Sequence, residues 1–359
     1  MKTVELVKNK IKDARSAVLG FGVSNIPLVE ILIECGNDIT VHDKNDFSKL
    51  DERAVEFKKR GVKFITGENY LEKIDADIIF RSPGIRPDYE RIERAIQNGA
   101  ELTSEMELFL ELTPAHVFAV TGSDGKTTTT TVAYKLLEKE FENSDRKIYV
   151  GGNIGTPLLS RVGEMTENDI CILELSSFQL FTMKKSPERA IITNLSPNHL
   201  DWHKDMTEYI AAKTNIFQNG CKHLTTNANN QYCRELLAEC KCNTSLFSAH
   251  LSCDDMLKVK QSESIYYLEN GCICCLEGDC VSKLIEVDDI LVPGIHNIEN
   301  YMAAISLTKG LVSNETLRHI ATTFTGVEHR LEFVREYCGV KYYNSSIDSS
   351  PTRTAAARW

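Results

Sequence analysis

An apolar segment, His116–Val120, runs directly into Thr121-Gly122-Ser123-Asp124-Gly125-Lys126-Thr127, and a helical pattern that reaches Phe141 follows. Glycines let the backbone turn tightly around an anion, so the N–H groups of the turn and of the helix start can face phosphates. Lys126 can reach the β and γ oxygens, and the Thr127 hydroxyl can hold Mg²⁺. Two residues separate the glycines, where the common P-loop has four. The flanking strand and helix nevertheless favour a phosphate-binding loop over a chance Gly-Lys-Thr turn.

Short apolar strands and helical patterns alternate along most of the chain. A helix is expected at residues 26–35, with Pro27 in its first turn and Gly36 after its end. Strands are expected at residues 17–19, 39–42, 62–65, 77–80, 116–120, 170–173 and 190–193, with a hairpin-rich stretch at 245–292. This alternation predicts an α/β protein: a Rossmann-like doubly wound domain followed by a central domain built on the phosphate loop.

Two domain boundaries are expected. Pro114 ends the helical stretch 104–112, which gives a first domain of residues 1–113 and a second of residues 114–326. Residues 327–359 hold one expected strand, 340–343, and a helix start at 349–352. One strand and half a helix cannot bury a core. This end is therefore expected to be only the start of a third α/β domain.

Composition restricts the possible partners. The formal net charge of −10 argues against nucleic acid, because a phosphate backbone requires a basic surface. No run of about 18 apolar residues predicts a membrane span, and the first residues do not form a signal peptide. We therefore expect a cytoplasmic protein, and a monomer. Nine of the 12 cysteines lie between Cys221 and Cys280; reduced thiols are a better interpretation than disulfides or zinc ligands, because no C-x-x-C pair repeats at finger spacing.

Further candidate residues follow the expected strands at their carboxyl ends, where a doubly wound sheet collects its ligands. Glu174 follows strand 170–173, and beside a phosphate loop such an acid suits Mg²⁺; a solvated glutamate is the alternative. His199 follows strand 190–193 and is either a ligand or a structural histidine. Lys213 lies in a helical pattern and is expected to be an ordinary surface lysine.

Two other groups of residues could recognise a nucleoside. Asn297 and Asn300 are three apart and lie on one face of an expected helix, where carboxamides can pair with adenine; helix capping is an equal alternative. In the first domain, the turn Gly20-Phe21-Gly22 has Asn25 in place of a third glycine, and Asp43 ends the second strand. This is a partial nucleotide-binding fingerprint, and a plain strand-to-helix turn is its alternative.

Taken together, these segments resemble the Mur ligase family, most closely its D-glutamate-adding type. The matching stretches occur in the family's order over nearly the whole chain. They are Gly20–Ser24, Ser82-Pro83-Gly84, Thr121–Thr127, Gly151-Gly152-Asn153-Ile154-Gly155, Glu174–Gln179, Asn194–Asp201, Ala211–Lys213, His296–Asn300 and His329-Arg330.

The resemblance implies a role for each matching residue. ATP would be bound by Gly122, Ser123, Asp124, Gly125, Lys126, Thr127, Thr128, Asn297, Asn300 and Arg330. The UDP-substrate would be bound by Gly22, Ser24, Asp43, Ser82, Gly84, Asn153 and Ser176. Thr127 and Glu174 would hold one Mg²⁺, and His199 with a carbamylated Lys213 would hold a second. The catalytic residues would be Lys126, Lys213, His199 and Asn153.

The activity implied is ATP-dependent ligation of D-glutamate to UDP-N-acetylmuramoyl-L-alanine through an acyl phosphate, in peptidoglycan precursor synthesis. Two alternatives stay open: another Mur or folylpolyglutamate-synthase-like ligase, and a non-catalytic nucleotide- or UDP-sugar-binding remnant. The chain also departs from the family pattern. Ser345-Ser346-Ile347 stands where the family has Asp-Ser-Lys, and Asp348 is a candidate substitute for the missing acid.

Overall fold

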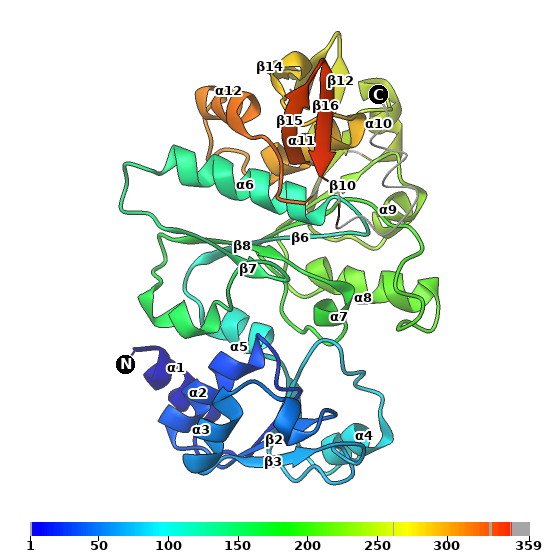
Figure 1. Ribbon diagram of the computed structural model, residues 1–359. Helices are drawn as coiled ribbons and strands as arrows, with labels where there is room; N and C mark the ends of the chain where they lie inside the picture. Colours follow the sequence, from blue (N-terminus) through cyan, green and yellow to red (C-terminus); the bar gives the residue numbers. More distant parts are fainter. Residues whose placement is uncertain (1, 261, 330–331, 345, 347–359) are drawn as a thin grey trace. The chain divides into compact units, whose positions relative to one another are not determined.

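The computed structural model in Figure 1 describes residues 2–260, 262–329, 332–344 and 346. The chain divides into two compact units. Unit 1 contains Met1–Ala115, Gly155–Asp169 and Phe178–Lys185, and unit 2 contains His116–Ile154, Ile170–Ser177 and Ser186–Trp359. The two later segments join unit 1 through contacts that the sequence did not indicate, since the Leu159 amide donates to Glu105 and the Gly163 amide to Thr3. The domain limits given above stay predictions.

Unit 1 contains a five-stranded parallel sheet in the order β3-β2-β1-β4-β5. Its strands are β1 (Ser16–Leu19), β2 (Ile39–Asp43), β3 (Lys63–Thr66), β4 (Ile78–Arg81) and β5 (Glu101–Thr103). Its helices include α1 (Lys2–Ile11), α2 (Asn25–Cys35), η1 (Phe47–Lys49), α3 (Arg53–Lys59), α4 (Glu90–Gln97), α5 (Glu105–Leu112) and η2 (Leu159–Glu164). Strand order reverses beside β1, so the doubly wound topology predicted from the sequence is confirmed.

The boundaries of α2 follow from local sequence. Gly36 takes a left-handed conformation, φ +83°, and its amide donates to the carbonyls of Ile33 and Leu32, which ends the helix. Leu28, Val29 and Leu32 are fully buried against the sheet. The predicted glycine stop after Cys35 is therefore confirmed.

Unit 2 contains a nine-stranded sheet in the order β14-β13-β12-β11-β10-β9-β6-β8-β7. Its strands are β6 (His116–Thr121), β7 (Ile148–Gly152), β8 (Ile170–Glu174), β9 (Arg189–Ile192), β10 (His223–Asn227), β11 (Asn243–Ser248), β12 (Ser264–Glu269), β13 (Cys272–Glu277) and β14 (Cys280–Glu286). The sheet is parallel from β7 to β12 and antiparallel from β12 to β14. The hairpin prediction holds for β12–β14 but was wrong at residues 245–248, which lie in the parallel strand β11, and at residues 253–259, which form a helix.

Helices cover both faces of this sheet (Figure 1). They are α6 (Lys126–Glu140), α8 (Met206–Gln218), α9 (Gln231–Leu236), α10 (Cys253–Val259), η3 (Val287–Asp289), α11 (Ile295–Leu307) and α12 (Asn314–Thr323). The short helix α7 (Ser177–Leu180) starts at the last residue of a unit 2 segment and continues into unit 1. A buried core joins α6, α11 and α12 to one sheet face through residues such as Leu136, Tyr301 and Ile320. The chain's last described elements, β15 (Glu332–Tyr337) and β16 (Val340–Asn344), form an antiparallel hairpin.

Two observations bear on the predictions from composition. All twelve cysteines are free thiols, and Cys272, Cys274, Cys275 and Cys280 lie on strands as expected. Among the described residues, none of the helices combines the length and the apolar character that a membrane crossing requires.

Glu105 generates a prediction about stability. It is buried at the start of α5 and accepts the Leu159 amide at 3.3 Å, and burial raises the pKa of its carboxyl to about 7. The folded state therefore keeps a proton that the unfolded chain, with a pKa near 4.5, has released. Stability should fall as pH rises from about 4.5 to 7.

We expect Glu105→Gln, which cannot ionise, to be more stable than the parent chain at pH 8 by about 1–3 kcal/mol, from ~1.4 kcal/mol per pKa unit. The difference should shrink towards pH 4.5. Urea denaturation followed by circular dichroism at both pH values measures it. A difference in the free energy of unfolding that does not change with pH would contradict a raised pKa for the buried Glu105 carboxyl.

Candidate active site

The phosphate loop connects β6 to α6 and depends on two glycines with positive φ. Gly122 has φ +147° and Gly125 has φ +78°. A Cβ atom on Gly122 would overlap the Thr193 hydroxyl, and one on Gly125 would overlap the Asn300 carboxamide. Both positions therefore exclude side chains, and Gly125 caps the start of α6.

Residues after β9 hold the loop from one side. The Asn194 carbonyl accepts the Ser123 amide at 2.9 Å, and its side-chain oxygen accepts the Asp124 amide at 3.0 Å. Thr193 Oγ1 donates to the Asp124 carbonyl at 2.5 Å. The Ser123 and Asp124 amides already have partners, so we expect an anion to bind at the first turn of α6 instead. Asn194 was not predicted to have this role.

Lys126 lies over the loop that it follows. Its Nζ donates to the carbonyls of Gly122 and Ser123, each at 3.0 Å. Thr127, the next residue, is buried in the first turn of α6. The two side chains predicted to meet phosphate and metal thus project from the start of one helix, where the helix dipole also favours an anion.

Lys213 corrects the sequence analysis, which expected an ordinary surface lysine. It is 1% exposed on α8, and its Nζ donates to Thr121 Oγ1 at 3.0 Å and to the Gly122 carbonyl at 2.9 Å. Burial, assisted by repulsion from Lys126, lowers the pKa of Lys213 well below its usual value. The error arose because periodicity places Lys213 on a helix but does not identify what covers that helix.

Glu174 ends β8 as predicted and is 1% exposed. Its Oε1 accepts Asn153 Nδ2 at 2.9 Å, and the Asn153 amide donates to the Glu174 carbonyl at 2.8 Å. Its Oε2 is buried and has no hydrogen-bond partner among the described residues. A buried carboxylate oxygen of this kind destabilises the folded state unless a cation or a hydrogen-bond donor binds to it.

Gly152, at the end of β7, explains how Asn153 reaches Glu174. It has φ +96°, and a Cβ atom there would overlap the Glu174 carbonyl. Ser176 follows Glu174 in the same loop and is half-buried. The structure thus brings together Asn153 and Glu174, two of the predicted site residues.

His199 lies in the turn after β9 and is exposed, with a left-handed φ of +54°. Its carbonyl accepts the amides of Trp202 and His203 at 3.1 and 2.9 Å. A non-glycine residue in this conformation is uncommon, and the surrounding turn must therefore determine it. Among the described residues, His, Cys, Asp and Glu side chains do not form a group of three or more that could hold a metal.

Asn297 and Asn300 share one face of α11, as predicted. Asn300 Nδ2 donates to Asn297 Oδ1 at 3.1 Å, and Asn300 Oδ1 accepts Thr129 Oγ1 of α6 at 3.2 Å. Gly294, not an asparagine, caps α11, so the capping alternative was wrong. Arg330, the third predicted nucleotide-binding residue from this part of the chain, lies outside the described residues.

The predicted UDP-binding residues in unit 1 gather at the carboxyl ends of β1, β2 and β4. The Asp43 carboxylate accepts hydrogen bonds from the Phe21 amide at 2.7 Å and the Asn45 amide at 2.8 Å. The bond to Phe21 stabilises the glycine turn of residues 20–22. Asn25 Nδ2 donates to the Gly20 carbonyl at 2.8 Å, which explains an asparagine at this position.

The remaining predicted residues of this group lie in the same region. Gly22 and Gly84 are exposed, and Ser24 and Ser82 are half-buried. A Cβ atom on Gly20 would lie 2.9 Å from Ser82 Cβ, so the turns after β1 and β4 are in close contact. Ser24 precedes α2 without a side-chain capping bond.

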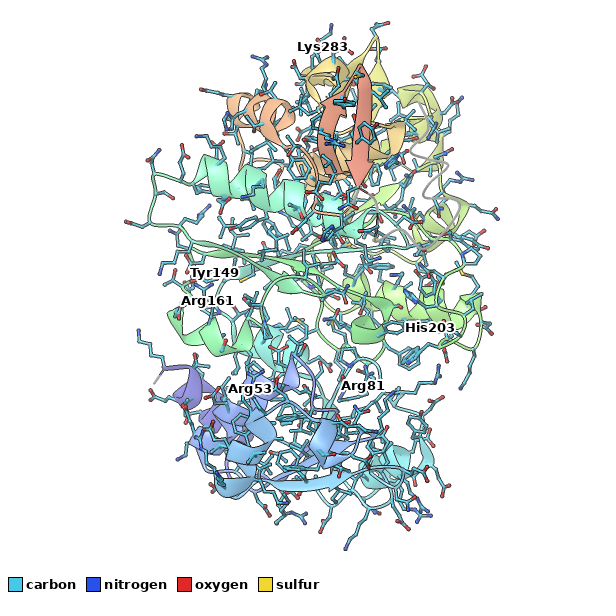
Figure 2. All side chains as sticks on the ribbon, in the orientation of Figure 1. Arg53, Arg81, Tyr149, Arg161, His203 and Lys283 are labelled. Atoms are coloured by element: carbon cyan, nitrogen blue, oxygen red, sulfur yellow. The ribbon has the colours of Figure 1, made fainter. Side chains whose placement is uncertain are left out.

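Arg81 is a residue of unit 1 that the sequence analysis missed (Figure 2). It is 1% exposed, and its Nη1 donates to the carbonyls of Ser82, Pro83 and Ile85 at 3.3, 3.0 and 2.7 Å. Burial lowers its pKa to about 10, which leaves it charged at neutral pH. One guanidinium therefore holds the turn that contains Ser82 and Gly84. An arginine directly before Ser-Pro-Gly was the only signal in the sequence.

Comparison with known proteins now identifies the class. The model of the Mur ligase middle domain matches residues 120–308. A protein of Ruminiclostridium cellulolyticum is 50% identical over 99% of this chain and 74% of its own length, and one of Acetivibrio thermocellus is 46% identical over 97% and 73%. The chain belongs to the Mur ligase family. Both of these relatives are named UDP-N-acetylmuramoylalanine--D-glutamate ligase, and the resemblance found in the sequence is confirmed.

Solved structures agree on the fold. A murein peptide ligase from Psychrobacter arcticus aligns with a TM-score of 0.53 at 18% identity, covering 95% of this chain and 74% of that one. The MurF ligase from Thermotoga maritima, solved in complex with ADP, aligns with a TM-score of 0.54 at 17% identity, covering 89% and 70%. At these identities the likeness concerns the fold alone.

The glycines of the phosphate loop allow a matched test. Gly125→Ala and Gly310→Ala both place a side chain at a left-handed position, φ +78° and +76°, but Gly310 faces open space and Gly125 faces Asn300. Each change should cost about 1 kcal/mol of stability through backbone strain. Only Gly125→Ala should also weaken ADP binding, by roughly tenfold or ~1.4 kcal/mol. Calorimetric titration with ADP compares them, and equal affinities in the two variants would contradict a role for the loop.

Proposed function

We propose that this chain joins D-glutamate to UDP-N-acetylmuramoyl-L-alanine at the expense of ATP, in peptidoglycan precursor synthesis. The observation that carries the proposal is the similarity, at 46–50% identity over nearly the whole chain, to relatives named for this reaction. The geometry supports it, because a phosphate loop, a buried strand-end carboxylate and a buried lysine lie in one unit.

ATP would bind with its phosphates at the start of α6. The amides of Gly125, Lys126 and Thr127 would face the phosphate oxygens, with Thr128 in the same turn, and Lys126 would move its charge from the loop carbonyls to the transferring phosphoryl group. Asn297 and Asn300 would recognise the nucleoside, and Arg330 would contribute from outside the described residues. Stabilising charge on that group is the main catalytic task in phosphoryl transfer.

Mg²⁺ fits the donor set of this site. The buried Glu174 Oε2 without a partner and the Thr127 hydroxyl are hard oxygen ligands of the kind Mg²⁺ prefers. These two residues would hold one ion, and His199 with a carbamylated Lys213 would hold a second. When bound, Mg²⁺ neutralises phosphate charge and aligns the reacting oxygens.

The surroundings of Lys213 support the proposal that it is carbamylated. An ammonium group cannot ligate a cation, whereas a carbamate offers anionic oxygens. The burial of the amine and the nearby positive charge of Lys126 both favour the neutral form, which is the form that adds CO₂. The Thr121 hydroxyl and the Gly122 carbonyl position that nitrogen.

In unit 1, the UDP-substrate would be bound by the turns that carry Gly22, Ser24, Asp43, Ser82 and Gly84. In unit 2, Asn153 and Ser176 are the residues proposed for this substrate. The substrate's alanine carboxylate would attack the γ-phosphate of ATP to give an acyl phosphate and ADP. The amine of D-glutamate would then attack the acyl carbon, and phosphate would leave. The protein would supply orientation and charge rather than a nucleophile.

The expected setting of the reaction is a cytoplasmic monomer that acts on small molecules. The net charge of −10 disfavours nucleic acid as a partner. The alternative of another Mur or folylpolyglutamate-synthase-like ligase has less support, since the relatives named above share one substrate name. The alternative of a non-catalytic binding remnant is decided by assay.

The deciding assay measures ADP formation by residues 1–359 with ATP, Mg²⁺ and UDP-N-acetylmuramoyl-L-alanine, with and without D-glutamate. We expect turnover that depends on D-glutamate. Turnover that instead requires a different amino acid would show that the chain is another type of Mur ligase. Binding of the UDP-sugar without turnover would identify a binding remnant, and binding of neither nucleotide would remove the proposal.

Lys213 gives a second test. In ¹³CO₂-equilibrated buffer, the parent chain should give a carbamate ¹³C signal that Lys213→Arg lacks, because a guanidinium does not add CO₂. A control, Lys135→Arg, changes an exposed lysine of α6 that pairs with Glu138 and should keep the signal. A signal that persists in Lys213→Arg would assign the carbamate to another lysine.

A further inference from the structure

His203 occupies the centre of a buried hydrogen-bond group in unit 2. Its Nε2 lies 2.9 Å from the hydroxyl of Ser177, and its Nδ1 lies 3.4 Å from Oε2 of Glu208. The histidine is 1% exposed and Ser177 is 2% exposed. Serine, histidine and glutamate in this order resemble a hydrolytic triad, but the serine is closed to solvent. The arrangement is therefore suited to holding structure rather than to nucleophilic attack.

Each partner of His203 connects to a different segment of the active site. Ser177 follows directly on the loop that carries Glu174 and Ser176. Glu208 lies in the first turn of α8, the helix that carries Lys213. The main chain of His203 donates to the His199 carbonyl at 2.9 Å and closes the turn in which His199 has its left-handed φ.

A fourth connection runs through Tyr209. Its ring packs edge-on against the His203 ring, with centroids 5.3 Å apart, and its hydroxyl lies 2.9 Å from Ser123 Oγ in the phosphate loop. Ser123 Oγ also accepts the Ser196 amide at 2.9 Å. One imidazole thus links the loop after β8, the His199 turn, the start of α8 and the phosphate loop. Figure 2 labels His203.

We propose that His203 is a positioning residue, which holds the His199 turn and the Glu174–Ser177 loop at the separation that the two proposed Mg²⁺ ions require. This rests on the proposed function, since it assigns Glu174 to one ion and His199 to the other. The hydrogen bond to Ser177 carries the restraint between the two loops. The contacts with Glu208 and Tyr209 fix the plane of the ring and so the direction of that bond.

The chain offers a matched control. His223 lies in a second group of the same chemistry, with Nε2 2.8 Å from Ser245 Oγ and Nδ1 3.1 Å from Glu263 Oε2. It begins β10, at the opposite end of the strands from the phosphate loop. His223→Asn therefore removes an equivalent histidine without touching the site, and it measures the structural cost of such a loss.

The variants His203→Gln and His203→Asn separate the two ring nitrogens. The glutamine amide extends far enough to replace Nε2 and reach Ser177, whereas the asparagine amide replaces only Nδ1. We expect His203→Asn to lower kcat by about 10- to 100-fold, as changes beside metal ligands do. His203→Gln should recover much of kcat, and His223→Asn should keep it.

Binding provides a readout that does not need turnover. ADP affinity is measured by calorimetry with Mg²⁺ and with EDTA, alongside the melting temperature of each variant. His203→Asn should lose most of the gain in affinity that Mg²⁺ gives, whereas its affinity in EDTA stays unchanged. Equal losses in His203→Asn and His223→Asn, or unchanged values in His203→Asn, would overturn the proposal. If the parent chain itself gains no affinity from Mg²⁺, the proposed function fails instead.

Discussion

The hydrogen bonds from Lys213 Nζ to Thr121 Oγ1 and the Gly122 carbonyl support the rest of the site. They join the buried face of α8 to the point where β6 becomes the phosphate loop. Thr193 and Asn194 hold the same loop from the end of β9. The loop keeps its shape because two segments that are distant in sequence, α8 and the end of β9, supply partners for backbone groups that would otherwise be buried without any. Gly122 is required because Thr193 approaches so closely, and Gly125 is required because Asn300 of α11 does.

The charges of the site explain why its residues suit a metal-dependent phosphoryl transfer. Lys213 interacts electrostatically with Lys126, Glu174 and Asp124. Lys213 and Glu174 are almost completely buried. An isolated charge at such a place is strongly unfavourable, so the lysine tends to be neutral and the carboxylate needs a cation. Conversion of Lys213 to a carbamate and the binding of Mg²⁺ would satisfy both requirements together. Unit 1 has a comparable feature, since the buried Arg81 satisfies carbonyls of the turn that contains Ser82.

Much of the fold could be predicted because its signals are local. Four of the five strands of unit 1, the glycine stop of α2 and the placement of Glu174 at a strand end follow from residue patterns within a few positions, whereas β5 was not predicted. The errors arose where local pattern was ambiguous. Residues 245–248 form a parallel strand although they precede a region of hairpins, and β15 was not predicted although its residues Glu332–Tyr337 pair with β16. A short apolar run does not specify its partner strand.

The sequence by itself determined the α/β class, the strand, glycine turn and helix of residues 116–140, and the family, because periodicity, glycine positions and the order of motifs are properties of the chain alone. Only the tertiary structure decided which side chains are buried together. Lys213 and Thr121 are 92 residues apart, and Arg81 and Thr182 are 101 apart. His203 meets Ser177 across 26 residues. Burial and pairing at such separations depend on how sheets and helices pack, which residue spacing does not encode.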